Sequence, residues 1–452
     1  MQHFGIDDPR SSPASSQLSL GALRARRPRG LREAHAHLPG LGEWLTTPRL
    51  DDCASLGECL ARVSAAAHDA RSAGLWLARL TSARVQGWPE ARWPSADELE
   101  HAGAGTPVVI MGFDHHSAAA SHSALTLTGL APGQTVPERG IVEADERGRA
   151  TGLLLEDAAY AVWRAGPTPP EHVRLAQVAA ALAHLADLGF EEVHDLHSPL
   201  WLGPALATLE RTGGLPMRVG LYAPFMEIHA ALTRRAEYES ERVRLLGTKL
   251  FADGTLNSRT AHLLHRYSEP MPGLPRGQCM IAPLLLDQHI RDCDEMDVQL
   301  AIHAIGDGAV RTVLDSVERT RPARNRVRLE HAEIIDRADV PRFAALGVTC
   351  SVQPCHLLSD IEALTRFVPH RLDRVLPLRE LLESGLVPGL CALPGEARTG
   401  LIFGSDVPIV RAEPEDSVLA AVTRRRPGMP PEAAIALDQA LPEADAWACF
   451  GG

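Results

Sequence analysis

The stretch Glu33–Leu38 reads EAHAHL and carries two histidines two positions apart. Residues two apart on a β-strand point to the same side, so His35 and His37 would direct both imidazoles at one point, as a bound metal ion requires. A chain with 20 histidines contains such pairs by chance, so the pair has to be weighed with other segments. The stretch predicts a strand that ends at a candidate metal site.

Short apolar runs recur along the chain and alternate with helical patterns. After the strand that ends at His37, we expect strands at residues 191–196, 217–222, 245–252, 298–302, 327–329, 348–352 and 401–403. Strands that alternate with helices form parallel sheets. Eight such repeats predict an α/β fold of the (β/α)8, TIM-like barrel type.

Residues that can bind metals or move protons follow several of these predicted strands. They are His37, Lys249, His303, His331 and Asp406. Because the functional groups of a parallel barrel gather at the carboxyl ends of its strands, we expect these side chains to meet. Imidazole and carboxylate ligands suit Zn²⁺ and also other divalent transition metals. A carboxylate beside a metal can also take a proton from water, which makes Asp406 a candidate general base.

Lys249 is the single lysine of the chain, in which the other 44 of the 45 basic residues are arginines. Arginine stays protonated at any ordinary pH, whereas a buried lysine can lose its proton. A neutral lysine amine can react with carbon dioxide to give a carbamate, whose two oxygens can bridge two metal ions. Chance survival of one lysine and a salt-bridged structural lysine are the alternatives.

The composition restricts the class of protein. The formal net charge of −12 argues against a nucleic-acid partner and suits an enzyme of small molecules. The chain shows no signal-peptide pattern and no apolar stretch of membrane-spanning length. Its eight cysteines include no CxxC pair, which favours reduced thiols in a cytoplasmic protein.

The spacing of the predicted elements suggests a domain organisation. Residues 1–28 are polar and read as an N-terminal tail, and residues 29–450 would form the barrel. Residues 40–175 would be a subdomain inserted between the first and second strands, with a helix in 55–74 and a strand in 107–113. Long insertions of this kind surround the barrel mouth and shape the site.

Six ordered segments resemble the amidohydrolase superfamily, in particular its YtcJ-like branch, the amidohydrolase-3 family. The segments are EAHAHL, KLFADGTLNSRTA, HAIGDGA, RLEHAE, SVQPCH and FGSDVP, and weaker matches in the insertion are DHHSAAASHSAL and TGLLLEDA. The resemblance covers about residues 29–450. It implies a metal-dependent hydrolase that cleaves amide or other C–N bonds of a small molecule with one or two zinc ions.

The resemblance also implies a metal-ligand set. Its members are His35, His37, Lys249, His303, His331 and Asp406. The first two histidines would bind the more buried metal, and His303 and His331 would bind the second. Lys249, as a carbamate derived from CO2, would bridge two metals.

Further roles follow from the same resemblance. Asp406 would act as general base and pass its proton to the leaving group, and His331 would be the second catalytic residue. Substrate contacts are implied for His116, Asp253, Arg259, Gln353 and His356. The chain departs from the family pattern at Glu33, where an aspartate is usual. The small β-sandwich that usually accompanies the barrel is expected to be absent or vestigial.

Other functions remain compatible with these residues, since a fold does not determine a reaction. One is hydrolysis of a lactone, another ester or a phosphoester, or an isomerisation, on the same fold. Another is a non-catalytic descendant that binds a ligand. A homodimer is a possible assembly for any of them.

Overall fold

The computed structural model describes residues 18–83, 85–112, 117–130, 140–165, 169–271 and 273–451. Contacts divide the chain into two compact units. The barrel unit comprises Met1–Leu41 and Ala181–Gly452, and the insert unit comprises Gly42–Ala180. The insert unit therefore interrupts the barrel unit between the first two strands of the latter.

Within the described residues, nine strands form the sheet of the barrel unit. They are β1 (Leu31–Ala36), β7 (Phe190–Leu196), β8 (Arg218–Pro224), β9 (Val243–Phe251), β10 (Gln299–Ala304), β11 (Val327–His331), β12 (Thr349–Val352), β13 (Val387–Pro388) and β14 (Gly400–Phe403). Their spatial order is β1-β7-β8-β9-β10-β11-β12-β14-β13, and all neighbouring pairs are parallel. All but the two-residue β13 lie where the apolar runs predict strands.

The two ends of this series of strands meet. Ala36 forms a parallel bridge with Val407, which follows β14. The Asp406 N–H donates to the carbonyl of His35 (N···O 2.7 Å), and the His37 N–H donates to the carbonyl of Val407 (2.9 Å). The sheet thus curls into the TIM-like α/β barrel that the eight strand patterns predict.

The barrel strands are buried on both faces, because side chains point alternately into the barrel and toward the helices outside it. All six residues of β10 are buried. Ala301 packs with Leu196 and Tyr222 in one buried cluster. Burial on both faces explains why apolar residues mark these strands in the sequence, although polar residues interrupt β1, β7 and β11.

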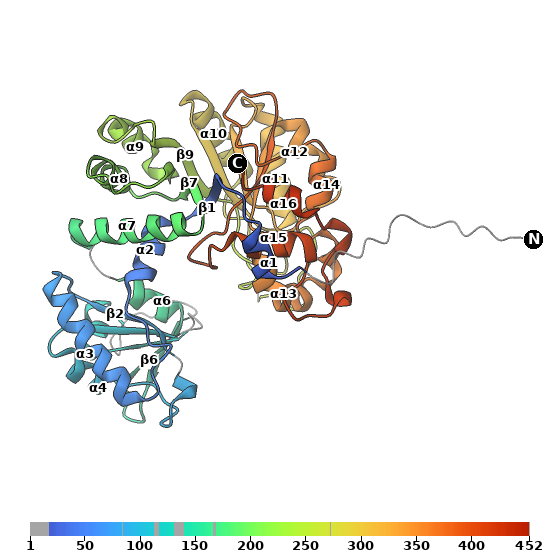
Figure 1. The fold of residues 1–452 in the computed structure, drawn as a ribbon. Coiled ribbons are helices and arrows are strands. Elements are labelled where there is room, and N and C mark those ends of the chain that lie inside the picture. The colour runs from blue at the N-terminus through green and yellow to red at the C-terminus, as the bar shows by residue number, and fades with distance from the viewer. Residues whose placement is uncertain are drawn as a thin grey trace, which may run out of the picture. The chain divides into compact units, whose positions relative to one another are not determined.

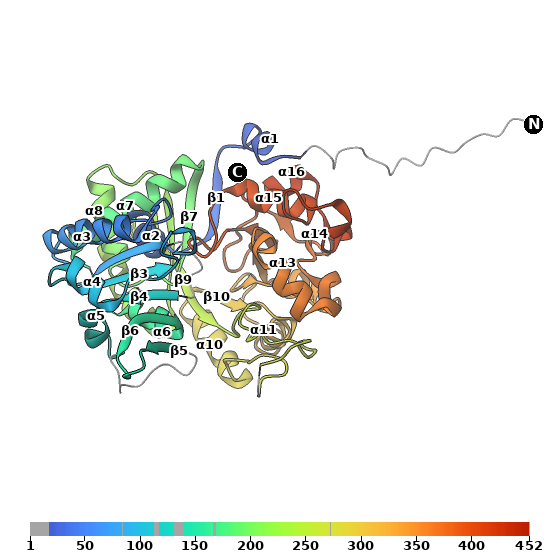
Figure 2. The ribbon, with the colours of Figure 1, turned by 90° about the horizontal axis from the view of Figure 1, so that it is seen from below.

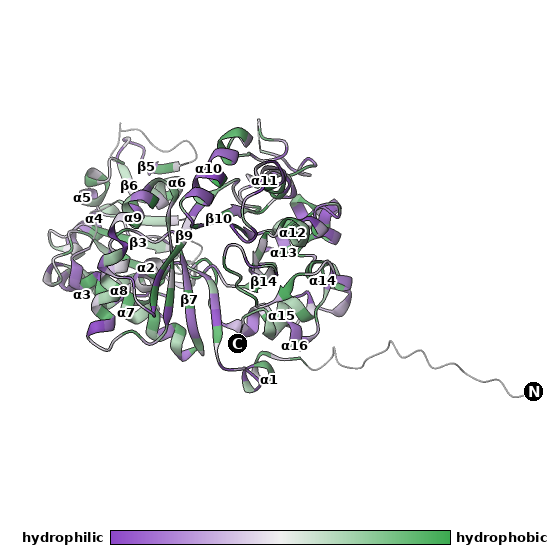
Figure 3. Ribbon diagram, turned by 90° about the horizontal axis from the view of Figure 1, so that it is seen from above, coloured by the Kyte–Doolittle hydropathy of each residue, from purple (hydrophilic) through white to green (hydrophobic). Residues whose placement is uncertain are grey.

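Helices lie outside the strands of this unit (Figure 1). They are α1 (Leu20–Ala25), α8 (Leu202–Arg211), α9 (Ile228–Arg234), α10 (Pro283–Glu295), α11 (Asp307–Thr320), α12 (Val340–Leu346), α13 (His356–Phe367), α14 (Leu378–Glu383), α15 (Pro414–Thr423) and α16 (Glu443–Ala448), with the 3-10 turns η3 (Phe225–Glu227), η4 (Arg235–Glu237), η5 (Pro369–Arg374), η6 (Pro431–Ala433) and η7 (Leu437–Gln439). In α11, buried Val310, Val313, Leu314 and Val317 recur every three or four positions, as in an amphipathic helix. In Figure 3, which colours the ribbon by hydropathy, the outer helices carry both hydrophilic residues (purple) and hydrophobic residues (green).

Part of the segment that we expect as a tail is helical. Helix α1 contributes the buried Leu23 and packs against α15. Ion pairs link Arg26 to Glu443 at 2.9 Å and Arg27 to Glu415 at 2.6 Å. The other end of the chain lies beside β1 (Figure 2), as the N–H of residue 32 donates to the carbonyl of residue 450. Both ends of the described chain therefore contact the barrel.

The insert unit contains a mixed five-stranded sheet of order β2-β3-β4-β6-β5. Its elements are α3 (Leu56–Ser72), β2 (Ala78–Ala83), η2 (Val85–Gly87), α4 (Ala96–Gly103), β3 (Val108–Gly112), β4 (Ser117–Ala120), α5 (His122–Leu127), β5 (Gly140–Ala144), β6 (Ala150–Glu156) and α6 (Asp157–Arg164); α2 (Leu38–Thr46) and α7 (Glu171–Asp187) cross between the units. Val108 and Ile110 of β3 join one core with α3, while Val109 and Met111 join a second core with α6. The apolar run that we expect as a strand therefore contains β3, which is covered on both faces.

Two further expectations concern an accessory β-sandwich and membrane-spanning helices. Apart from isolated bridges, the described strands all belong to the two sheets above, so no accessory β-sandwich accompanies the barrel in this part of the chain. Within the same ranges, no helix combines the length and the apolar character needed to cross a membrane.

Candidate metal centre

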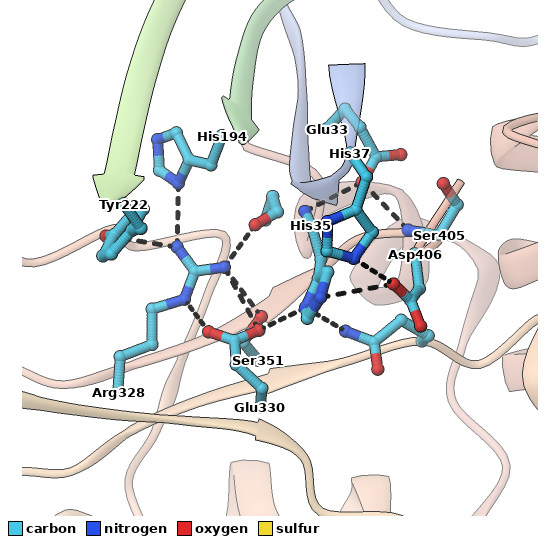
Figure 4. A network of polar contacts seen from close by, with 12 residues as sticks. Glu33, His35, His37, His194, Tyr222, Arg328, Glu330, Ser351, Ser405 and Asp406 are labelled. Atoms are coloured by element: carbon cyan, nitrogen blue, oxygen red, sulfur yellow. Dashed lines mark hydrogen bonds and ion pairs between the residues drawn. The ribbon is translucent and has the colours of Figure 1, made fainter. Parts of the chain in front are cut away.

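Strand β1 and the segment after β14 bring three potential ligands together. One ligand atom from each of His35, His37 and Asp406 lies within 4.8 Å of the others. Nε2 of His37 lies 2.9 Å from Oδ1 of Asp406, and Nε2 of His35 lies 3.4 Å from the same oxygen (Figure 4). The i, i+2 spacing on β1 thus does place both imidazoles on one side, facing one carboxylate.

The carboxyl group of Glu33 holds β1 against the end of β14. Its Oε1 accepts hydrogen bonds from the N–H groups of His35 and Ser405, both at 2.9 Å. Burial raises the pKa of Glu33 to about 7, although these two donors pull in the opposite direction. The adjacent Asp406 has a φ of 66°, a left-handed conformation that is uncommon outside glycine and clusters at functional sites. This turn aims its carboxylate at the two histidines.

His303 and His331 stand at the ends of β10 and β11, beside this group. Their ring centroids are 4.4 Å apart, and the ring of His331 is 4.8 Å from that of His35. His331 has a φ of 71°, so the chain leaves the regular strand geometry at that residue. Nδ1 of His331 is buried and has no hydrogen-bond partner. A buried imidazole nitrogen without a hydrogen-bond partner is available to bind a metal ion.

The surroundings keep the imidazoles of His35, His303 and His331 neutral, which is the form that binds metals. Burial would lower the pKa of His37 as well, but the hydrogen bond and the charge of Asp406 outweigh it and raise that pKa. Burial, followed by the charge of Lys249, lowers the pKa of His35 to about 4 and that of His303 to about 3. Burial and the neighbouring histidines lower the pKa of His331 well below its usual value. Burial would raise the pKa of Asp406, but His35 and His37 outweigh it and hold that pKa below its ordinary range. Neutral imidazoles and an ionised carboxylate form a donor set that fits a divalent transition metal.

Fixed hydrogen bonds determine which nitrogen of two histidines is available. Nδ1 of His35 lies 2.7 Å from Oε2 of Glu330, whose pKa is held below its usual range by Arg328 and His35 although burial would raise it. An ionised carboxylate only accepts, so Nδ1 carries the proton and Nε2 is left toward Asp406. Nε2 of His303 likewise donates to the carbonyl of Gly254 (3.0 Å), which leaves Nδ1.

Lys249 lies on β9 and is buried. It pairs in register with Ala301, two residues before His303 on β10. Burial lowers the pKa of Lys249 to about 8, although Glu330 and Asp406 act to raise it. Its Nζ lies over the ring of Phe251, 5.4 Å from the centroid. The lowered pKa favours the neutral amine, which is the form that reacts to give a carbamate.

A polar network that sequence reasoning missed lies behind His35 (Figure 4). Arg328 is fully buried and forms an ion pair with Glu330. Its guanidinium also donates to Nδ1 of His194 (2.8 Å) and to Oγ of Ser351 (3.1 Å). The i, i+2 spacing of Arg328 and Glu330 just before His331 is the signal that would have placed both on the same face of β11.

The residues expected to contact substrate lie in different surroundings. Nε2 of Gln353 is 3.3 Å from Nδ1 of His35, and Nε2 of His356 is 4.0 Å from Oδ2 of Asp406, so both border the cluster. Asp253 accepts backbone N–H groups of residues 262, 305 and 306 at 2.8 to 3.0 Å. Arg259 lies over the ring of Phe367 and donates to the carbonyl of residue 269. His116 lies outside the described residues.

Fold and site together define a parallel α/β barrel with a candidate metal centre at the carboxyl ends of its strands. The model of the Amidohydrolase family matches residues 30–442. The chain therefore belongs to the amidohydrolase family, a family of hydrolases, as the six sequence segments predict.

Individual relatives agree with this assignment. The chain is 26% identical to "Putative amidohydrolase YtcJ" of Bacillus subtilis (strain 168), over 92% of this chain and 76% of the relative. It is 23% identical to the N-substituted formamide deformylase of Arthrobacter pascens, over 78% and 66% of the two chains. The crystal structure of an uncharacterized metal-dependent hydrolase from Pyrococcus horikoshii OT3 superposes with a TM-score of 0.72 at 26% identity, over 92% and 78%.

Proposed function

We propose that this chain is a metal-dependent hydrolase that cleaves an amide-type C–N bond of a small molecule. The observation that carries the proposal is the meeting of His35, His37 and Asp406, with ligand atoms within 4.8 Å of one another at the carboxyl ends of the barrel strands. The names of two relatives, a metal-dependent hydrolase and a formamide deformylase, support the metal and the bond type.

The chain offers ligands for one or two metal ions. His35, His37 and Asp406 would hold the first ion, and Zn²⁺ is the ion that such nitrogen and oxygen ligands favour. His303 and His331 would hold the second ion. Lys249, converted to a carbamate, would supply the oxygens between the two. Burial of its amine and the lowered pKa support this conversion.

When bound, a divalent metal lowers the pKa of water toward neutrality and polarises a substrate carbonyl. Asp406, which the nearby histidines keep ionised, accepts a proton from the attacking water. The same carboxyl group then returns that proton to the leaving nitrogen, so that an amine departs. His331 is the second proposed catalytic residue, and its ring contacts the rings of His35 and His303.

The location that we propose is cytoplasmic. All eight cysteines are free, and most of them are buried. Free, buried thiols are ordinary in a reducing compartment.

Metal content and a substrate panel test the proposal. Purified full-length protein, loaded with Zn²⁺ and freed of excess ion, should retain one or two equivalents by plasma mass spectrometry. The panel contains formamides and N-acyl amino acids, with lactones and phosphoesters as the alternatives. Amide turnover that a chelator abolishes and Zn²⁺ restores is the expected result. A protein that retains no divalent metal under these conditions would rule the proposal out. If only esters are hydrolysed, the proposed amide hydrolase would be an ester hydrolase instead.

A further inference from the structure

A cavity of about 380 Å³ adjoins the candidate metal centre. Its lining residues all belong to the barrel unit and are His37, Pro39, Gly40, Asp195, His197, Pro199 and Phe251. His37 is shared with the centre, because its Nε2 contacts Asp406 at 2.9 Å. A volume of this size is within the range of small-molecule sites. A ligand in the cavity therefore lies next to the residues that we propose for catalysis.

Phe251 presents an unusually exposed ring to this cavity. It is the last residue of β9, two positions after Lys249, and 44% of its surface is exposed. Its ring centroid lies 5.9 Å from that of His197 and 5.3 Å from that of His303. The ring thus stands between the cavity and the metal centre. Aromatic rings at such distances favour edge or offset contacts, and a planar ligand group can join them.

His197 forms the adjoining part of the wall, just after β7, with its ring in edge contact with that of Phe251. Its φ of 105° lies in the region that residues other than glycine rarely adopt. The N–H groups of His197 and Ser198 both donate to the carbonyl of Tyr222, at 3.0 and 2.7 Å, and hold this turn. His197 is exposed as a result. Strained residues of this kind cluster at ligand sites.

Among the described lining residues, His37 and His197 are the two that could offer a positive charge to an acidic ligand group, and His37 already contacts Asp406. The one carboxylate of the cavity, Asp195, is buried and already accepts from the N–H of Leu38 and from Oγ of Ser198, both at 2.6 Å. None of the described lining residues is an arginine or a lysine. A carboxylate or phosphate on the ligand would therefore lose its water without gaining an arginine or lysine as its partner. Ring faces and proline surfaces instead suit an uncharged group.

We propose that this cavity binds an uncharged, ring-containing group of the substrate, packed against the rings of Phe251 and His197. The bond to be cleaved then lies at the metal centre, on the side of His37. The substrate class is an amide that carries a neutral aromatic substituent rather than an acidic one. The orientation of the substrate depends on the proposed hydrolase function, whereas the cavity itself is defined by its lining.

Two inert probes measure the cavity without any reaction. They are benzyl alcohol, which is neutral, and 4-(hydroxymethyl)benzoate, which adds a carboxylate to the same ring. Dissociation constants are measured by ligand-observed NMR titration of the metal-loaded full-length chain. Benzyl alcohol should bind at least fivefold more tightly than the benzoate. Phe251→Ala should weaken benzyl alcohol binding about tenfold, the equivalent of one lost ring contact with its buried surface.

Matched variants separate the cavity from a general loss of structure. Phe251→Tyr keeps the ring and should retain binding, and Leu284→Ala removes a side chain that is 82% exposed on α10, outside the cavity lining. Benzyl alcohol affinity that is equal in wild type, Phe251→Ala and Phe251→Tyr would overturn the proposal. Tighter binding of the benzoate would overturn it as well.

A second arm compares hydrolysis of N-benzylformamide and N-methylformamide. Phe251→Ala should raise KM for the benzyl substrate and leave that for the methyl substrate within twofold. If neither amide is hydrolysed but benzyl alcohol binding depends on Phe251, the proposed amide hydrolysis fails and the cavity assignment stands. If both are hydrolysed and Phe251→Ala changes neither KM nor probe binding, the cavity assignment fails and the hydrolase stands.

Discussion

Oε2 of Glu330 lies 2.7 Å from Nδ1 of His35, and both side chains are buried inside the barrel (Figure 4). This contact fixes the proton on Nδ1 and points Nε2 toward Asp406. Arg328 in turn pairs with Glu330 and keeps it ionised. Metal-binding histidines commonly have such a carboxylate behind them, which sets the ring orientation and raises ligand basicity.

Replacing Glu330 by Gln should therefore weaken metal binding. The amide cannot hold His35 as an ionised carboxylate does, so we expect a loss of roughly 10- to 100-fold in metal affinity. Competition with a chromogenic chelator measures the affinity for Zn²⁺. Glu432→Gln, at an exposed position in η6, is the control. Equal affinity in wild type and Glu330→Gln would contradict a positioning role for this residue.

Asp406→Asn tests the proposed general base. The amide cannot accept a proton from water, so turnover should fall by about 10² to 10⁴. Metal should remain bound in part, because His35 and His37 are intact. Initial rates on the best substrate of the panel and metal content are measured together. Asp373→Asn, at an exposed position in η5, is the control; turnover of Asp406→Asn near the level of Asp373→Asn would remove Asp406 as the base.

A carbamate on Lys249 has a direct spectroscopic readout. The chain contains one lysine, so metal-loaded protein prepared in ¹³C-bicarbonate should show one lysine-carbamate carbon resonance. The resonance should be lost in Lys249→Arg, because a guanidinium does not release its proton at ordinary pH. Metal content should fall in the same variant. A resonance that persists in Lys249→Arg arises elsewhere, and its absence from wild type would leave Lys249 as a free amine.

The buried pair Arg328 and Glu330 should matter for stability as well. Arg328→Met leaves a buried carboxylate without its partner, which costs about 3 to 5 kcal/mol of unfolding free energy. The double variant Arg328→Met/Glu330→Leu removes both charges and should recover much of that loss. Urea denaturation of the three proteins, followed by circular dichroism, measures the change. A double variant that is less stable than Arg328→Met would contradict this account of the pair.

Much of the barrel follows from local sequence. The predicted strands coincide to within a few residues with β1, β7, β8, β9, β10, β11, β12 and β14. Strands that are buried on both faces are rich in apolar residues, and this local signal marks them. The i, i+2 spacing of His35 and His37 likewise determines that both rings leave β1 on the same side.

Only the tertiary structure decided which side chains meet. Asp406 reaches His35 because the last strand closes on the first, and a left-handed turn at residue 406 aims its carboxylate. Glu330 on β11 reaches His35 on β1, although β12 and β14 lie between these two strands. Phe251 at the end of β9 and His197 just after β7 line one cavity. These contacts depend on the closure of the barrel and on the direction that the chain takes after each strand ends. The periodicity of the sequence predicts neither the closure nor these turns. It indicates the face of the strand on which a residue lies, but not the distant residue that it contacts.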